Sequence, residues 1–261
     1  MEEIIVTSWN DLNERLYQDS WMPDIRRHRS HFAFRGLSTA SYPLETTLAR
    51  LRGDPGRLEG HLLRNFRKYA HQNVIERDSL WNWLALAQHH HLPTRLLDWT
   101  YSPYVALHFA TAETEKSNLD GVVWCVDFVA VRKLLPKILA GELDREGADV
   151  FTVEMLTRVA GSLATFDSLS DESFAAFIEP PSLDDRIVNQ FALFSVLSNS
   201  RASFEDWLVL HPDLVRKVII PSGLKWEVRD KLDQANISER VLFPGLDGLS
   251  QWLKRHYSYR D

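Results

Sequence analysis

The chain has 261 residues, enough for one large domain or two small ones with a substantial hydrophobic core. Apolar residues make up 44% and charged residues 25%, as in ordinary globular proteins, and the net charge of −6 gives no overall basic field of the kind that binds nucleic acid. The single cysteine, Cys125, excludes an intrachain disulfide and favours a reducing compartment.

Strands and helices interleave over the first hundred residues. The expected elements are a strand over 3–9, a helix over 8–17 capped by Ser8, a strand over 31–36, a loop leading into a helix over 38–52, a long helix over 57–77, a helix over 79–90 capped by Ser79, and an extended segment over 94–100. The capping serines can accept hydrogen bonds from the first helical turn. Apolar residues at helical spacing support the long helix.

The second part of the chain continues this mixture. The expected elements are a helix over 103–114 begun by Ser102 and Pro103, a buried strand over 122–131, a mixed region over 132–180, a loop over 180–186, one strand or two strands joined by a bend over 187–197, a strand over 216–221, a helix over 223–235 capped by Ser222, and a final helix after 243–248. The irregular spacing between strands predicts an α+β fold with mixed, mostly antiparallel sheets rather than a doubly wound sheet. We expect one domain over 31–255, with 1–30 as an N-terminal strand-helix extension packed on it.

Two further features concern the location and partners of the protein. The acidic start MEEIIV lacks the pattern of a secretory signal peptide, and no apolar stretch approaches the roughly 20 residues of a membrane helix. We therefore expect a soluble cytoplasmic protein without a membrane partner. The run Arg26, Arg27, His28 and Arg29 is the one basic cluster near a site, and it reads either as a solvated linker or as part of that site.

The stretch from Gln88 to Ala110 is unusually rich in polar residues before an apolar helix. Its histidines, His89, His90 and His91, are consecutive, so on a helix they point about 100° apart and cannot easily bind one metal ion. The sequence has no HExxH or CxxC motif either, and we expect no metal. We expect one or two of these histidines to cap the helix end or to face a cleft.

Two charged residues follow in the segment PTRLLDWT. Arg95 and Asp98 stand three apart on an extended segment, so they lie on opposite faces and need separate partners. A structural role is open for each, with Arg95 in a buried pair with a distant acid and Asp98 as a helix cap. The functional alternative is an anion or nucleotide cleft with Thr94, Thr100 and Ser102 as hydrogen-bonding neighbours.

The tripeptide FRG at 34–36 suggests similar chemistry at a strand end. Arg35 can present its planar guanidinium to a phosphate, while Gly36 allows a sharp turn. GxSxG, Walker A and GxGxxG motifs are absent, and no spacing of serine, histidine and aspartate picks out a catalytic triad.

Together these segments resemble the FRG domain family, which is named for its Phe/Tyr-Arg-Gly motif. The matching segments are HFAFRGLSTASYPLETTLAR, AQHHHLPTRLLDWTYSPYVALHFA, RIVNQFALFSV and the tail that begins VIIPSGLKWEV. Their order and spacing also match, and the resemblance runs from about residue 4 to residue 255.

The layout of this family resembles the ADP-ribosyltransferase fold, which implies an NAD-binding site. By that resemblance Arg35 holds the NAD phosphates, Thr100 and Ser102 stand at the hydroxyl positions that fix the ribose, and Trp99 or Tyr101 forms an aromatic wall for nicotinamide. Such transferases carry a late-strand glutamate, whereas this chain has DDRIVNQFALF, with Asp184 and Asp185 nearby. The remaining residues expected in the cleft are Asp98 as the substitute carboxylate, His89, Arg95, Arg186 and Gln190.

These expectations lead to two main hypotheses. The first is an NAD-consuming ADP-ribosyltransferase-like enzyme that modifies a macromolecular acceptor, as a toxin or a phage-defence effector. The second is a non-catalytic module that binds a nucleotide or another phosphorylated ligand in signalling or defence. A third, a purely structural protein, leaves the polar stretch at 88–102 unexplained.

Overall fold

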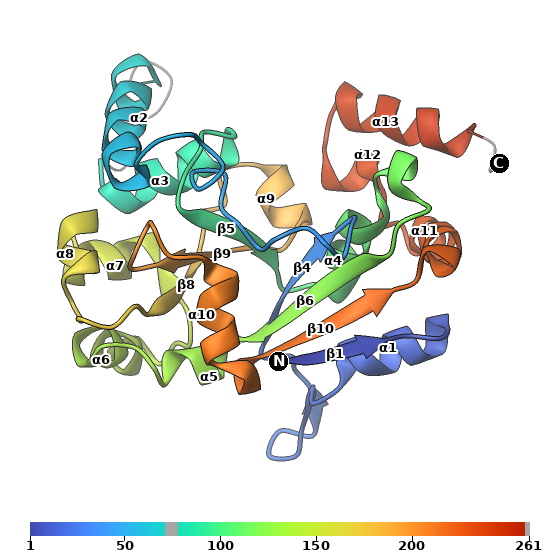
Figure 1. Cartoon of the computed structure of the whole chain (residues 1–261), viewed down its shortest axis with the longest axis horizontal. Coiled ribbons are helices and arrows are strands. Elements are labelled where there is room, and N and C mark those ends of the chain that lie inside the picture. The colour runs from blue at the N-terminus through green and yellow to red at the C-terminus, as the bar shows by residue number, and fades with distance from the viewer. Residues whose placement is uncertain (71–77, 259–261) are drawn as a thin grey trace.

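The computed structural model describes residues 1–70 and 78–258, and the described residues form an α+β fold around an eight-stranded sheet (Figure 1). In spatial order the strands are β1 (Glu2–Ile5), β10 (Val215–Ile220), β6 (Gly121–Asp127), β4 (Phe32–Leu37), β5 (Leu96–Thr100), β9 (Ala192–Leu197), β8 (Ala175–Glu179) and β7 (Phe151–Thr152). The two edge strands lie parallel to their neighbours, and the other pairs are antiparallel. The predicted α+β class with mostly antiparallel pairing is confirmed.

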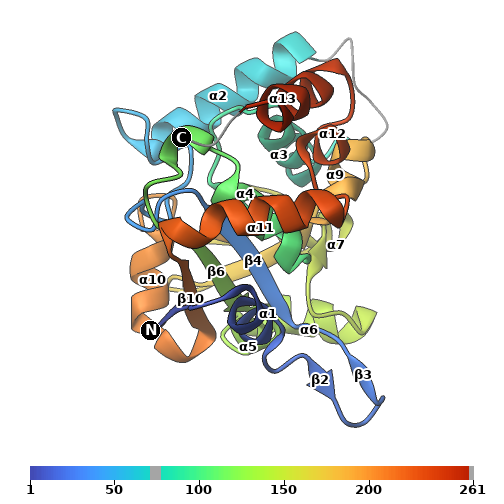
Figure 2. The same ribbon diagram turned by 90° about the vertical axis from the view of Figure 1, so that its right-hand side faces the viewer.

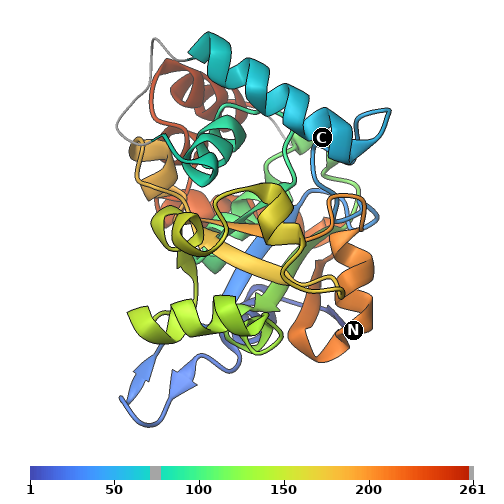
Figure 3. The same ribbon diagram turned by 90° about the vertical axis from the view of Figure 1, so that its left-hand side faces the viewer.

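Helices cover both faces of the sheet (Figures 1 and 3). One core cluster packs β4, β6 and β10 against α1 (Trp9–Tyr17), α4 (Pro103–Thr111) and α11 (Ser222–Gln234). A second packs β5, β7, β8 and β9 against α2 (Pro55–Ala70), α3 (Leu80–His89), α6 (Lys137–Glu146), α7 (Val153–Val159) and α8 (Leu163–Asp167). The third lies on the opposite face, under α5 (Phe128–Arg132) and α10 (Phe204–Leu210).

Short elements complete the described chain. They are a separate two-stranded hairpin of β2 (Trp21–Met22) and β3 (Arg27–His28), the helices α9 (Asp185–Asn189), α12 (Glu239–Leu242) and α13 (Leu246–His256), and the 3-10 turns η1 (Thr114–Lys116) and η2 (Pro212–Leu214). The N-terminal segment is joined to the sheet, because β1 pairs with β10.

Three of the four serines predicted as helix N-caps occupy that position in the structure. Ser8, Ser79 and Ser102 each precede a helix, and each hydroxyl accepts a hydrogen bond from a first-turn N–H group. Ser222 was predicted as a cap and is instead the first residue of α11, with Pro221 at the N-cap position. The predicted helix over 57–77 is present as α2, and its last part, 71–77, lies outside the described residues.

One predicted helix is absent and one predicted strand is shorter than expected, because other contacts take the backbone groups of these segments. The segment 38–52 contains turns and no helix; Leu44 N donates to Glu205 Oε2 (2.8 Å) and Leu48 N donates to the carbonyl of Thr94 (3.2 Å). The strand predicted over 122–131 ends at Asp127, whose carboxylate accepts from Ala130 N (2.8 Å) and starts α5. In each segment the backbone conformation is set by a hydrogen bond to a distant residue or to a capping side chain, and not by the local sequence pattern.

Gly36 is required by packing, not by a turn. Its strand continues to Leu37, so the expected sharp turn at Gly36 is wrong. A Cβ atom at this position would lie 1.8 Å from the carbonyl oxygen of Ala106 and 2.7 Å from Ala110 N, both in α4. Only glycine lets α4 pack this closely on β4, which fixes the helix behind the strand that carries Arg35.

Cys125 lies in the middle of β6 and is buried. Burial raises the pKa of its thiol to about 12. The thiol is therefore protonated and packs as a small hydrophobic group, as the sequence predicts.

Candidate functional site

A cleft of about 270 Å3 opens where strands β4 and β5 separate. β4 pairs with β6 at six positions but with β5 at only one of the described positions, Phe34 with Thr100. Side chains from β4, β5, α3, α4, α9 and the start of β9 line the opening. The gap in the ladder leaves room for a ligand beside two strands that carry charged residues.

Arg35 crosses this gap. Its Nη1 donates to the backbone carbonyl of Asp98 (2.5 Å) and lies 3.9 Å from Oδ2 of the same residue. Its Nε is buried and has no hydrogen-bond partner among the described residues. Burial lowers the pKa of the guanidinium, Asp98 opposes this shift and Arg50 adds to it. Because arginine keeps its proton in proteins, Arg35 presents a partly unmatched cation to the cleft.

Asp98 is held by a chain of side chains from α3 and the start of β5. Gln88 Nε2 donates to Asp98 Oδ2 (2.9 Å), and Thr94 Oγ1 donates to Gln88 Oε1 (2.5 Å). Gln88 and Thr94 are buried, whereas the side chain of Asp98 is 59% exposed. The hydroxyl of Thr94 thus orients the amide of Gln88, and this amide in turn orients the accessible carboxylate of Asp98. The alternative role of Asp98 as a cap for α4 is not observed, since Ser102 caps that helix.

Two of the three histidines face the cleft and meet α9. His89 Nε2 lies 2.7 Å from Asp184 Oδ2, and His91 Nε2 lies 3.2 Å from Arg186 Nη1. Asp184 also caps α9 through Ile187 N (3.1 Å). Although burial raises the pKa of Asp184, the bonds from Ile187 and His89 lower it overall. The carboxylate of Asp184 is therefore ionised and holds α9 against the end of α3.

Arg186 is the second arginine of the cleft. Its guanidinium lies over the ring of Phe243, 5.3 Å from the centroid. Its Nε is buried and unpartnered among the described residues, as is that of Arg35. The two arginines come from segments about 150 positions apart in the sequence, and the cleft brings them together.

Gln190 and Thr100 meet at the start of β9. Thr100 Oγ1 donates to the backbone carbonyl of Gln190 (2.7 Å), and Gln190 Nε2 donates to the carbonyl of Leu242 (2.9 Å). Phe191 then adopts a left-handed conformation with φ of 46°, which turns the chain into the strand. The predicted strand over 187–197 therefore begins only at Ala192, after the helix α9 and this turn.

The structure does not bring three of the predicted site residues to the cleft. Arg95 is buried, and its guanidinium donates to Glu59 (2.6–2.9 Å) and to Asp167 (2.5 Å). Tyr101 donates to Glu179 Oε1 (2.8 Å), and Ser102 is occupied as the cap of α4. The structural alternative for Arg95, a buried pair with a distant acid, is the one observed.

Strand alternation explains the position of the aromatic residues. Asp98 and Thr100 point to one face of β5, so Trp99 and Tyr101 point to the other. Trp99 borders the cleft, but its indole donates to Ser195 Oγ (2.8 Å) and packs in the core cluster under α5 and α10. Phenylalanine side chains line the cleft instead, namely Phe34, Phe109 and Phe194.

The residues that line the cleft without having been named as site residues include Thr47, Gln88, His91 and Phe109. For Gln88 and His91 a signal was present, because both lie in the polar stretch beside His89. Phe109 sits in the apolar helix α4, where its pattern indicates core packing. Thr47 comes from a segment with no local signal.

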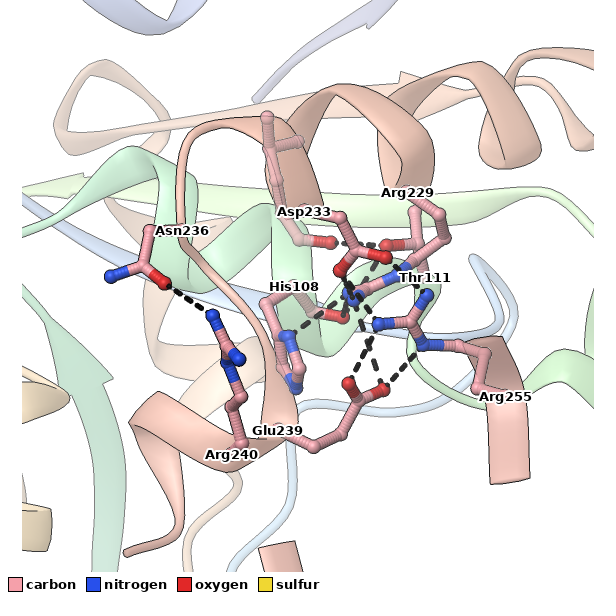
Figure 4. A network of polar contacts seen from close by, with 9 residues as sticks. His108, Thr111, Arg229, Asp233, Asn236, Glu239, Arg240 and Arg255 are labelled. Carbon is pink, nitrogen blue, oxygen red and sulfur yellow. Dashed lines mark hydrogen bonds and ion pairs between the residues drawn. The ribbon is translucent and has the colours of Figure 1, made fainter. Parts of the chain in front are cut away.

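A buried charge network joins the C-terminal helices, which contact the cleft residues Arg186 and Gln190 (Figure 4). Arg255 of α13 donates to Glu239 and Asp233, each at 2.7 Å, and so ties α13 to α12 and α11. Arg229 of α11 lies 2.9 Å from Nδ1 of His108 in α4. Because arginine can only donate, Nδ1 accepts, and His108 is neutral with its proton on Nε2. Leu242 is the last residue of α12, and Phe243 follows it. By holding α12, the network therefore also holds the ring of Phe243, which contacts Arg186, and the carbonyl of Leu242, which accepts from Gln190.

The arrangement has the chemistry of an anion site with one acid. Two arginines with free donor capacity suit a phosphate or pyrophosphate, and the phenylalanine rings suit a planar ring. Among the described residues that line the cleft, Asp98 alone carries a carboxylate. Within the described chain, no group of three or more histidine, cysteine, aspartate or glutamate side chains is placed to hold a metal ion. None of the described helices is long and apolar enough to cross a membrane.

Residues 30–119 match the family model of the FRG domain. The matched segment supplies Arg35, Gln88 and Asp98 to the cleft, whereas Arg186 and Gln190 lie beyond it. No curated protein and no solved structure matches the chain.

Proposed function

We propose that the cleft binds NAD through its phosphates and that the protein is an ADP-ribosyltransferase-like enzyme. The observation that carries this proposal is that the guanidinium groups of Arg35 and Arg186 line one cleft together with Asp98, whose carboxylate is held by Gln88. Among the described residues neither guanidinium donates a hydrogen bond to a carboxylate, so an anionic ligand in the cleft would supply further counter-charge to both arginines.

The arginines account for phosphate binding. A guanidinium offers several donors in one plane, and Arg35 and Arg186 approach the cleft from different walls. The cleft has about 270 Å3, near the lower end for small-molecule sites, so a dinucleotide would extend past its opening. The resemblance to the ADP-ribosyltransferase layout favours NAD over other nucleotides.

Asp98 supplies the electrostatic part of the reaction. When the bond between nicotinamide and the ribose carbon breaks, nicotinamide leaves with the bonding electrons and positive charge develops on the ribose. A fixed carboxylate stabilises that charge because it needs no reorganisation. An acceptor group then attacks the ribose carbon and loses a proton. The acceptor is a macromolecule in a transferase and water in simple NAD hydrolysis.

Gln190 supports the second candidate, a module that binds a nucleotide or another phosphorylated ligand without turnover. It stands near the start of β9, where the resemblance leads us to expect a glutamate, and its Nε2 is engaged by Leu242. A neutral amide cannot offset positive charge as a carboxylate does. In this case the arginines bind the ligand and Asp98 positions Arg35.

Three variants separate these candidates. Asp98→Asn removes the charge but keeps an oxygen that can accept from Gln88, and Arg35→Ala removes the phosphate donor. Arg201→Ala is the matched control, because Arg201 is an exposed arginine paired with Asp54 outside the cleft. NAD binding is measured by calorimetry, and nicotinamide release and label transfer to lysate proteins are measured with labelled NAD.

The transferase proposal expects distinct losses. Asp98→Asn should keep NAD binding and lower turnover by about 10²–10³-fold, as for removal of one preorganised electrostatic group. Arg35→Ala should weaken binding, and Arg201→Ala should match the wild type. Binding that depends on Arg35 without any nicotinamide release would support the module instead. Absence of NAD binding in a folded wild-type protein would overturn the assignment of NAD.

A further inference from the structure

A small β-hairpin projects from the body of the protein and takes no part in the cleft (Figures 2 and 3). In it Trp21 pairs with His28 and Met22 pairs with Arg27. Its base is closed by a hydrogen bond from Arg29 N to the carbonyl of Ser20 (2.6 Å), and its tip by one from Arg26 N to the carbonyl of Pro23 (3.2 Å). The hairpin is thus a built projection rather than an irregular tail.

Large apolar side chains are exposed on this hairpin. Every residue from 21 to 29 is exposed, and Trp21, Met22 and Ile25 are 52%, 41% and 52% exposed. Ile25 and Pro23 lie in the turn, and Trp21 and Met22 lie next to it. Single exposed apolar residues are ordinary, but a cluster on one projection indicates a partner with an apolar interior.

The same hairpin is locally basic in an acidic chain. Arg26, Arg27 and Arg29 stand against one acid, Asp24, and none of the three arginines pairs with a described carboxylate. His28 is occupied within the hairpin by Ser20 Oγ (3.1 Å) and the ring of Trp21. The partner should therefore be negatively charged at the surface that meets the arginines.

We propose that this hairpin docks the protein on the surface of an anionic lipid bilayer. Tryptophan favours the interface between headgroups and acyl chains, methionine and isoleucine favour the acyl side, and arginines bind lipid phosphates. An insertion of roughly 5–10 Å suffices for such a contact. Since the hairpin projects, its tip can meet the bilayer ahead of the acidic body, and physiological salt screens charges that lie more than about 8 Å apart.

A nucleic acid fits these features less well. A hairpin that enters a groove brings the attached body close to the phosphates on either side, and the body of this chain is acidic, with a net charge of −6 for the whole sequence. The apolar tip would also find no apolar interior in an undistorted duplex. Lipid accounts for both the charge and the exposed apolar side chains.

Docking by the hairpin would leave the cleft accessible. In Figures 1 and 2 the hairpin lies at one end of the molecule, and α3 and α9, which line the cleft, lie toward the other. The expectation of no membrane partner rested on the lack of a spanning segment. Peripheral docking needs no such segment.

Vesicle flotation of the full chain tests the proposal. Vesicles of phosphatidylcholine alone are compared with an equal mixture of phosphatidylcholine and phosphatidylserine. The test variants are Trp21→Ser with Ile25→Ser, and Arg26→Ala with Arg27→Ala. The matched control is Tyr69→Ser with Arg64→Ala, which removes an exposed aromatic residue and an exposed arginine from α2. All changes are at exposed positions, and circular dichroism confirms that each variant folds.

The wild type and the control variant should float with the mixed vesicles and much less with phosphatidylcholine alone, and raised salt should weaken binding. Each removed arginine should lower the partition coefficient about fivefold, and the tip variant should lower it at least tenfold. No preference of the wild type for the mixed vesicles would overturn the proposal. So would unchanged binding of the hairpin variants, or hairpin-dependent binding to DNA or RNA without binding to vesicles.

Discussion

His108 makes the stability of this fold depend on pH, because the folded chain keeps the buried ring neutral. Burial, together with the nearby charge of Arg229, lowers the pKa of His108 from 6.5 to about 3, and Glu239 only partly opposes this. In the unfolded chain the ring is exposed and has its ordinary pKa of about 6.5. Below that pH the unfolded chain binds a proton that the folded chain does not bind.

The size and sign of the effect follow from these two pKa values. Preferential protonation of the unfolded chain lowers the free energy of unfolding as the pH falls, starting near pH 6.5 and levelling off below about pH 3. At pH 5 the unfolded pKa lies roughly 1.5 units above the pH, and each unit is worth about 1.4 kcal/mol. His108 should therefore lower the stability by about 2 kcal/mol between about pH 7.5 and pH 5.

Glu239 acts in a lower range and does not obscure this window. Although burial raises its pKa, the bonds from Arg255 lower it from 4.5 to about 2. A depressed carboxylate pKa contributes stability above the unfolded value, and this contribution is lost as the pH falls from about 4.5 toward 2. Measurements at pH 5 and above therefore report mainly on histidines.

Urea unfolding of the wild type and of His108→Asn at about pH 7.5 and pH 5 measures the effect. The asparagine oxygen can accept from Arg229 where Nδ1 accepts in the wild type, but it binds no proton. The wild type should lose about 2 kcal/mol more stability than this variant on acidification. His61→Asn, at an exposed position on α2, is the control and should behave as the wild type does. Equal losses in the wild type and His108→Asn would refute a buried neutral His108.

Two further predictions concern buried contacts that support the cleft. Glu59→Gln removes the buried carboxylate that pairs with Arg95 and should lower the free energy of unfolding by about 3–5 kcal/mol, and a loss below 1 kcal/mol in urea unfolding would contradict a buried ion pair. Gly36→Ala places a methyl group against the carbonyl of Ala106 and should cost at least about 1–3 kcal/mol. Gly60→Ala in α2 meets nothing within 4 Å and should instead stabilise by about 0.5–1 kcal/mol, so similar effects of the two alanines on the melting temperature would refute the packing argument.

Local signals in the sequence identify much of the secondary structure. Ser8, Ser79 and Ser102 were recognised as caps because the bond between a hydroxyl and the first helical turn depends only on neighbouring residues. Alternation and apolar runs located the core of the central strands for the same reason. The α+β class follows from the order of these elements.

Long-range contacts account for what the sequence did not predict. The segment 38–52 has a helical pattern, but its N–H groups bind Glu205 and Thr94, which are distant in the chain. The local sequence suggests a turn at Gly36, but the reason for glycine is the close packing of α4, since a Cβ atom there would lie 1.8 Å from the carbonyl oxygen of Ala106. Neither the partner nor the distance is written in the local pattern, so intrinsic preference gives way to tertiary packing.

The composition of the cleft follows from the same principle. The polar residues from 88 to 102 lie together in the sequence, but β5 sends Asp98 and Thr100 to the cleft and Trp99 and Tyr101 to the other face. The antiparallel pairing of β5 with β9 adds a residue that is distant in the sequence. Thr100 stands opposite Ala192, and the turn before β9 places the carbonyl of Gln190 where Thr100 Oγ1 donates to it. A polar stretch in the sequence can therefore locate a site, but strand register decides which of its residues enter it.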